Sequence, residues 1–133
     1  MAYVLDTSAV LAVLKAESGY EKVAEILAEA ESDAGQDLLL PFMAVMETQY
    51  RLLRDLPQEE VLAAVRLVEA WPVTVMESTP SWRQRAAEVK SRGGLSVADA
   101  WIASLALLHD AELVHKDPEF DNVEGLRSCR LTD

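Results

Sequence analysis

At 133 residues, with 50% hydrophobic and 26% charged residues, the chain has the length of one domain with a sizeable core and lacks the composition of a disordered protein. Its single cysteine, Cys129, excludes an internal disulfide framework and a cysteine-based zinc site, and favours the reducing cytoplasm. Twelve lysines and arginines against 23 aspartates and glutamates give a net charge of −11, which repels nucleic acid unless the basic residues gather on one face.

The first third of the chain predicts two strands, each followed by a helix. Residues 3–5 form a short apolar run that ends in Asp6-Thr7-Ser8, a turn and cap before a helix over 9–14. A second helix is predicted over 20–30 and a strand over 37–40, after which Pro41 suits the first turn of a helix that reaches about residue 54. This segment has no basic leader region, and no apolar run of the chain approaches the length of a membrane span.

The rest of the chain continues the alternation. A helix over 58–70 precedes a strand over 73–76, a polar helix runs from residue 80 to Gly93-Gly94, and Ser96 caps an apolar helix that reaches about His109. Residues 112–115 predict a further strand and 126–131 an edge strand. Strands separated by helices pair in parallel through right-handed crossovers. The prediction is therefore a single α/β domain over 1–133, a three-layer α/β/α sandwich around a mostly parallel sheet.

Two acids follow the predicted strands directly. Asp6 comes straight after the first strand, and Asp117 comes two residues after the strand over 112–115. Ligands of open α/β sheets bind beyond the carboxyl ends of the strands, so both acids belong to the edge where a site is expected. Each also has a purely structural interpretation, Asp6 as a turn or cap residue and Asp117 as an N-cap before Pro118.

Two further acids are predicted on helices that begin at the same edge. Glu47 shares a helical face with Met43, Ala44 and Tyr50, and Asp99 shares one with Ile102, Ala103 and Ala106. The spacing of Ser96 and Asp99 also fits a capping box, which leaves helix capping as an alternative for Asp99.

These four acids have no lysine or arginine among them. Like charges brought together at about 4 Å repel by roughly 1 to 4 kcal/mol per pair, so such a cluster requires a cation. Oxygen ligands favour the hard ions Mg²⁺ and Mn²⁺ over zinc, and this points to metal-assisted phosphoryl chemistry.

The segments that carry these acids, VLDTSAVLA, MAVMETQYRL, LSVADAWIASLAL and LVHKDPEF, resemble the four acidic blocks of the PIN-domain ribonucleases. The bacterial and archaeal VapC-type toxins are especially similar in length and in the order of the blocks. The resemblance implies a PIN-like fold and a metal-dependent endoribonuclease, in which Asp6, Glu47, Asp99 and Asp117 hold one or two Mg²⁺ or Mn²⁺ ions. It also implies hydrolysis by an activated water, with a 3′-hydroxyl and a 5′-phosphate as products.

One position departs from the family. Its members often have Thr or Ser two residues before the last acid, where this chain has His115, so a hydroxyl contact near the metal or substrate is missing. Asp121 is a second candidate for the fourth acid. Ser8 and His115 are candidates for contacts to the substrate or to the metal ligands, with helix capping and a strand-end role as their alternatives.

Other classes of function fit less well. An aspartyl phosphatase needs a second aspartate two residues after the first, and position 8 is Ser. A cleavage mechanism through the ribose 2′-hydroxyl needs a histidine pair, and only His109 and His115 are available. A PIN enzyme of RNA processing without an antitoxin, and a non-catalytic module that binds protein or RNA, remain alternatives.

The resemblance also implies partners, namely an RNA substrate, a small antitoxin that blocks the site, and a second copy of the chain. A homodimer would use the third and fourth helices, where the apolar candidates, with core packing as their alternative, are Met43, Met46, Leu52, Leu53, Leu62 and Val65. RNA binding falls to a subset of the basic residues Lys15, Arg51, Arg54, Arg83, Arg85, Lys90, Arg92 and Lys116.

Overall fold

Parallel strands form one sheet at the centre of the computed structural model, which describes residues 1–32 and 36–132. The five strands of this sheet are β1 (Ala2–Leu5), β2 (Asp37–Pro41), β3 (Thr74–Met76), β4 (Glu112–His115) and β5 (Arg127–Arg130). Their order is β3-β2-β1-β4-β5, with Val4 paired to Leu39 on one side of β1 and to Leu113 on the other. The strand order reverses between β1 and β4, and such a switch point opens a crevice at the carboxyl ends of the strands.

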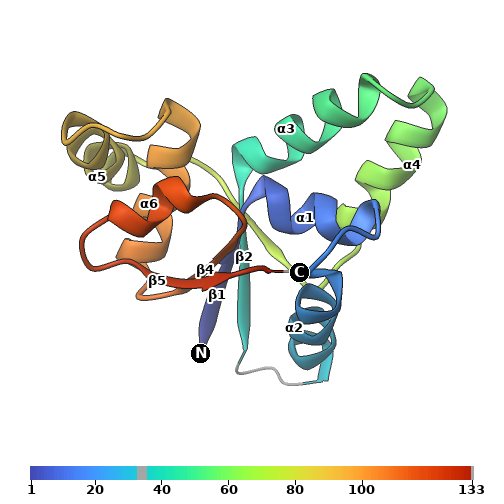
Figure 1. Ribbon diagram of the computed structural model, residues 1–133, viewed down its shortest axis with the longest axis horizontal. Coiled ribbons are helices and arrows are strands. Elements are labelled where there is room, and N and C mark those ends of the chain that lie inside the picture. Colours follow the sequence, from blue (N-terminus) through green and yellow to red (C-terminus); the bar gives the residue numbers. More distant parts are fainter. Residues whose placement is uncertain (33–35, 133) are drawn as a thin grey trace.

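Helices cover both faces of this sheet. They are α1 (Thr7–Leu14), α2 (Tyr20–Ser32), α3 (Phe42–Leu53), α4 (Gln58–Glu69), α5 (Pro80–Ser91), α6 (Val97–Leu108) and the short 3₁₀ helix η1 (Pro118–Asn122). Helices α5 and α6 lie together on one side of the sheet, α1 and α2 lie on the other, and α3 and α4 form a hairpin above α1 (Figure 1). The prediction of a three-layer α/β/α sandwich is confirmed, with every strand pair of the described sheet parallel.

The side chains of β1 divide the core into two layers. Val4 packs with α6 in one apolar cluster, whereas Tyr3 and Leu5 pack with α1 and α2 in another, as expected from the alternation of side chains along a strand. Burial on both faces explains why the inner strands have no polar side chain between residues 3 and 5 or between 38 and 40.

The predicted and observed start positions of two helices, α1 and α3, differ by one or two residues. Helix α1 begins at Thr7 rather than at residue 9, because the Asp6 carboxylate caps it by accepting from the main-chain N–H of Ala9 at 3.1 Å. Pro41 was predicted within the first turn of its helix, but it lies at the N-cap position, just before Phe42.

The apolar residues proposed for a dimer surface separate into two groups. Met43 and Leu52 are buried, and Leu52 packs with Leu11 and Val61 beneath the α3–α4 hairpin, so a surface role for these two was wrong. Met46, Leu53 and Leu62 are exposed by 59%, 46% and 38%, while Val65 is partly buried. Among the described helices, none is long and apolar enough to cross a membrane.

Candidate active site

A cavity of about 580 Å³ opens at the carboxyl ends of β1 and β4, between α1, α3 and α6. Asp6, Glu47, Asp99 and Asp117, the four acids selected from the sequence, all line this cavity. The other residues that line it are Thr7, Ser8, Leu11, Lys15, Glu17, Arg51, Ser96, Ile102, Lys116 and Pro118. The strand-order switch therefore places the acids where parallel α/β sheets bind ligands.

Asp6 is the most enclosed of the four acids, with 5% of its surface exposed. Its main-chain N–H donates to the carbonyl of Val114 at 3.2 Å, which ties the end of β1 to β4. Burial raises the pKa of the Asp6 carboxyl to about 7, against the opposing effect of hydrogen bonds from Ser8 and Ala9. A charged Asp6 is therefore costly until a cation joins it.

Ser8 connects the two strand ends through its side chain. Its hydroxyl donates to Oδ1 of Asp6 at 2.5 Å and accepts from the main-chain N–H of Lys116 at 3.1 Å. Lys116 directly precedes Asp117, so this hydroxyl fixes the position of Asp6 relative to the segment that carries Asp117. The observed role of Ser8 is thus a bridge between the acid-bearing segments rather than the cap of α1, which Asp6 provides.

Glu47 lies in the middle of α3 and its carboxylate lines the cavity. Its Oε1 is buried and has no hydrogen-bond partner among the described residues. A buried carboxylate oxygen without a donor is unfavourable, so this atom is suited to a ligand that brings positive charge.

Asp99 is the third residue of α6 and takes part in half of the predicted capping box. Ser96 Oγ accepts from the main-chain N–H of Asp99 at 3.1 Å, but among the described residues no hydrogen bond joins the Asp99 carboxylate to the N–H of Ser96. The cap therefore uses the backbone of Asp99, while the Asp99 side chain lines the cavity. Burial, followed by the nearby charge of Asp117, raises the pKa of the Asp99 carboxyl to about 6, against the opposing effect of a hydrogen bond from the Ser96 side chain.

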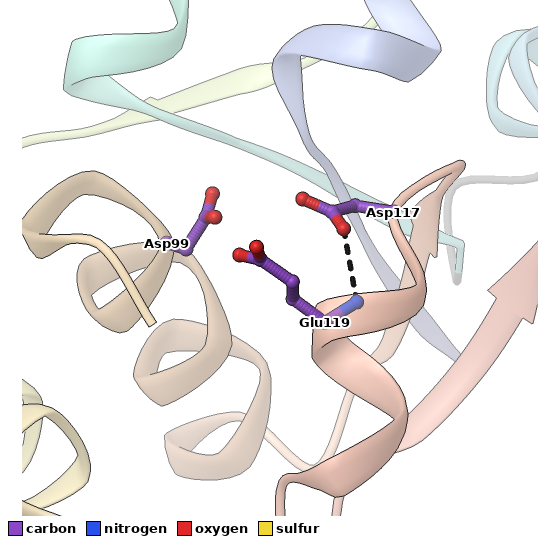
Figure 2. A group of neighbouring side chains, drawn as sticks. All are labelled: Asp99, Asp117 and Glu119. Atoms are coloured by element: carbon purple, nitrogen blue, oxygen red, sulfur yellow. Dashed lines mark hydrogen bonds between the residues drawn. The ribbon is translucent and has the colours of Figure 1, made fainter. Parts of the chain in front are cut away.

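Asp117 and Asp99 form a cluster with Glu119, a residue that the sequence analysis missed. One carboxylate oxygen from each of the three residues lies within 4.8 Å of the others. Figure 2 shows the carboxylates of Asp99 and Asp117 on either side of that of Glu119, which extends from η1 toward α6. Oδ1 of Asp117 accepts from the main-chain N–H of Glu119 at 2.9 Å and so begins η1. The sequence did contain a signal for Glu119, because this acid lies two residues after the predicted N-cap acid in the segment Asp117-Pro118-Glu119.

Comparison of the amino-acid sequence with protein-family models identifies the family of this chain. The PIN-domain family model matches residues 3–126, nearly the whole chain. This chain belongs to the PIN-domain family. A comparison of the sequence with curated proteins gives no match.

Solved structures share the fold of this PIN domain at low sequence identity. A chain of VapBC2 from Rickettsia felis, bound to a DNA fragment from its promoter, is 16% identical with a TM-score of 0.79, over 99% of this chain and 100% of that one. VapBC-1 from nontypeable Haemophilus influenzae is 22% identical with a TM-score of 0.75, over 98% of both chains. VapC20 from Mycobacterium tuberculosis, a toxin that cleaves the sarcin–ricin loop, is 18% identical with a TM-score of 0.72, over 92% of this chain and 95% of that one.

Two further candidates from the sequence, Asp121 and His115, lie outside the cavity lining. The carboxylate of Asp121 accepts from Arg130 at 3.0 Å and does not line the cavity. His115 is fully buried beneath it, with its ring against Phe120 at a centroid distance of 4.9 Å. Burial lowers the pKa of His115, which keeps the imidazole neutral.

His115 acts on the site through the main chain of Asp117. Its Nδ1 accepts from the N–H of Asp117 at 3.1 Å, so the proton of the neutral ring lies on Nε2. Nε2 is buried without a partner among the described residues. The His115 side chain therefore holds the main chain of Asp117, one of the acids that line the cavity.

Basic residues also line the cavity, and two of them form ion pairs with acids other than the selected four. Lys15, Arg51 and Lys116 line it, with Lys15 paired to Asp55 and Lys116 to Glu17, each at 3.8 Å. In the described part of the chain, no ion pair engages the four acids. The cavity thus offers a hard divalent cation several carboxylate oxygens. Asp99, Asp117 and Glu119 bring theirs within 4.8 Å of one another, and Oε1 of Glu47 is buried without a hydrogen-bond partner among the described residues.

Proposed function

We propose that this PIN-domain protein is a Mg²⁺- or Mn²⁺-dependent endoribonuclease, and that it is the toxin of a type II toxin–antitoxin pair. The observation that carries the proposal is the meeting of Asp6, Glu47, Asp99 and Asp117 in one cavity, where no cationic side chain of the described residues is paired to them. A nuclease needs such a concentration of carboxylates to hold metal against an anionic substrate, whereas a module that only binds RNA gains nothing from it.

The metal would be held by Asp6, Glu47, Asp99 and Asp117, and Glu119 is close enough to Asp99 and Asp117 to join them. When bound, Mg²⁺ or Mn²⁺ supplies Lewis-acid activation of water and neutralises charge on the scissile phosphate. Ser8 and His115 hold the acid-bearing main chain in place, and Ser96 does the same for Asp99. The expected products carry a 3′-hydroxyl and a 5′-phosphate.

Substrate binding at the cavity falls to its basic residues. Lys15, Arg51 and Lys116 offer positive charge in an otherwise acidic cavity, which suits the phosphates that flank the scissile bond. General acid–base catalysis by a histidine pair is unsuited to this site, since His115 is fully buried and His109 caps the far end of α6.

The proposed partners follow from the structural neighbours and from the exposed apolar surface. The chains of similar fold from Rickettsia felis and Haemophilus influenzae are parts of VapBC assemblies, which supports a small antitoxin for this protein in the cytoplasm. Met46, Leu53 and Leu62 on the α3–α4 hairpin are exposed and suited to a homodimer contact.

The test of the proposed activity is cleavage of RNA by the purified protein. Cleavage should require Mg²⁺ or Mn²⁺, stop with chelator, and continue when the ribose at the cut carries no 2′-hydroxyl. Glu47→Gln should lower the rate by about a hundredfold or more, while Glu69→Gln, a charge loss on exposed α4, should leave it unchanged. Cleavage that persists in chelator and needs the 2′-hydroxyl would refute the metal mechanism, and RNA binding without cleavage would favour a non-catalytic module.

A further inference from the structure

A second, smaller cavity lies between α5 and α6, outside the acidic site. Its volume is about 170 Å³, and it is lined by Arg83, Ala86, Ala87, Lys90, Val97, Ala100 and Trp101. Sites for drug-sized ligands occupy about 300 to 1,000 Å³, so this cavity suits a smaller group such as one nucleobase. None of the described acids lines it, in contrast to the active-site cavity.

The aromatic part of this cavity is held rigidly. Trp101 is half-buried and makes edge-to-face contacts with Trp82 at a centroid distance of 4.9 Å and with Phe42 at 5.4 Å. The indole N–H of Trp82 donates to the carbonyl of Trp101 at 2.9 Å and to Ser104 Oγ at 3.0 Å. An aromatic ring that is already fixed loses little conformational freedom when a base stacks on it.

The charge of this cavity differs from that of the whole protein. From residue 80 to residue 92 a single acid, Glu88, stands against the four basic residues Arg83, Arg85, Lys90 and Arg92, in a chain with a net charge of −11. Arg83 and Lys90 are two helical turns apart on one face of α5, and both are exposed. Neither has an ion-pair partner in the described part of the chain. Two cations beside an aromatic ring, unpaired in the described part of the chain, suit the two phosphates that flank a nucleotide and its base.

The first turns of α6 separate this cavity from the active site. Ser96, Asp99 and Ile102 line the active-site cavity, whereas Val97, Ala100 and Trp101 line the second one. The two cavities therefore lie on opposite sides of one helix, whose diameter with side chains is about 10–12 Å. A single strand that crosses the N-terminal end of α6 would span this distance with a few nucleotides.

We propose that the cavity lined by Arg83, Lys90 and Trp101 binds a nucleotide of the single-stranded RNA substrate, a few positions away from the cleaved bond. This inference rests on the proposed ribonuclease function and adds a subsite to it. An acidic protein segment would use the two cations, but it would gain little from the rigid aromatic ring in so small a cavity.

The test is RNA binding by the full chain in chelator, where cleavage is absent, measured by fluorescence anisotropy at several salt concentrations. The double variant Arg83→Ala/Lys90→Ala should weaken binding at least about tenfold and reduce the slope of log K against log salt by about 1.4, since each phosphate contact to a single strand contributes about 0.7. Arg85→Ala is the matched control, because Arg85 lies on the same helix but lines a different pocket with Gln84, Glu88 and Leu108. It should change affinity by less than about twofold.

The aromatic contribution is tested with two variants of Trp101. Trp101→Leu keeps an apolar side chain but removes the ring, and should weaken RNA binding about tenfold. Trp101→Phe keeps a stacking face and should remain within a few-fold of the parent. Circular dichroism and melting temperature establish whether each variant is folded. If the leucine variant does not fold, the phenylalanine variant still tests the position.

Three results would overturn this subsite. The first is RNA affinity that is unchanged in Arg83→Ala/Lys90→Ala. The second is a loss of RNA affinity and a change of salt slope in Arg85→Ala that equal those of the double variant. The third is a double variant that no longer binds an oligoglutamate peptide but still binds RNA as the parent does. In each case metal-dependent cleavage by the parent would leave the ribonuclease function intact. Conversely, specific RNA binding at Arg83 and Lys90 by a parent that does not cleave with Mg²⁺ or Mn²⁺ would sustain the subsite and defeat the proposed activity.

Discussion

The hydroxyl of Ser8 lies between the carboxylate of Asp6, to which it donates at 2.5 Å, and the main-chain N–H of Lys116, from which it accepts at 3.1 Å. One hydroxyl thus holds together the ends of β1 and β4, the two strands that flank the switch in strand order. The same hydrogen bond lowers the pKa of Asp6 against the larger effect of burial. Ser8 therefore favours the charged form of the acid that is proposed to bind metal.

Replacing Ser8 tests this coupling. Ser8→Ala removes the donor to Asp6 and leaves the N–H of Lys116 without its acceptor, so we expect about tenfold weaker Mg²⁺ binding, in line with the loss of a hydrogen bond to a metal ligand. The loss should be greater below about pH 7, where protons compete with metal for Asp6. Titration calorimetry across pH measures both effects, and Ser8→Thr, which keeps the hydroxyl, is the control. Equal metal binding in the alanine variant would contradict the role given to Ser8.

The stability of the metal-free protein should depend on pH through Asp6. The folded-state pKa of about 7 lies above the usual value near 3.9, so between these values the native state binds more protons than the unfolded state. Stability should therefore fall as the pH rises through this window and level off above about pH 7. The total effect is a few kcal/mol, since each pKa unit corresponds to about 1.4 kcal/mol.

Asp6→Asn isolates this effect, because asparagine keeps the shape of the side chain and does not titrate. In chelator, its melting temperature should equal or exceed that of the parent above about pH 7, and the difference should shrink or reverse near pH 5. Mg²⁺ should stabilise the parent more than the variant. A variant that melts well below the parent at high pH, with the same response to metal, would make Asp6 a structural turn residue.

Asp99 separates capping from metal binding because the two use different atoms. Ser96 caps α6 through the backbone of Asp99, so changes of the Asp99 side chain should leave the helix intact. Asp99→Glu keeps the charge but moves the carboxylate outward by one methylene, and we expect a folded protein with activity lowered at least about tenfold. Asp99→Gln should be as stable and less active. Full activity in both variants would leave Asp99 without a role in cleavage.

His115 is predicted to orient Asp117 through Nδ1. His115→Asn places an amide oxygen near the position of Nδ1, whereas His115→Gln places its polar atoms near the position of Nε2 and removes the acceptor for the N–H of Asp117. Both changes leave some unfilled space beside Phe120. The glutamine variant should lose more metal affinity than the asparagine variant at similar stability. The measurements are Mg²⁺ affinity and melting temperature. Equal Mg²⁺ affinity in the two variants would show that His115 contributes to packing of the core and does not orient Asp117.

Glu119 and Asp121 form a matched pair of acids on η1. Glu119 approaches Asp99 and Asp117, while Asp121 is paired with Arg130. Glu119→Gln should therefore raise the Mg²⁺ concentration needed for half-maximal cleavage by several-fold, and Asp121→Asn should have little effect, as expected for an exposed ion pair. The reverse order of effects would restore Asp121 as the additional acid of the site.

The sequence was sufficient to predict the sheet and the edge at which the acids meet. Asp6 and Asp117 follow apolar runs that can only be inner strands of a parallel sheet, and Glu47 and Asp99 lie on helices that begin at the same edge. Proximity of the four acids then follows from topology, without knowledge of any side-chain conformation.

The local course of η1 was beyond such reasoning. Glu119 and Asp121 are two residues apart in a helix of about 3.0 residues per turn, so they point in different directions, and only the packing of Phe120 against His115 decides which one faces the cavity. For the same reason, periodicity did not reveal that Leu52 is buried while Leu53 is exposed by 46%. These outcomes depend on how one element is rotated against its neighbours.

The bond between Ser8 and Lys116 joins residues 108 positions apart, and it belongs to the pairing of the first strand with the fourth. The chain must therefore be synthesised at least as far as Asp117 before this acid can meet Asp6, and pairing over such a separation is slow to form. The proposed cleavage site cannot assemble before β4 has been made and has paired with β1. For an enzyme proposed to cut RNA, this order of synthesis delays the appearance of activity beside the message that encodes it.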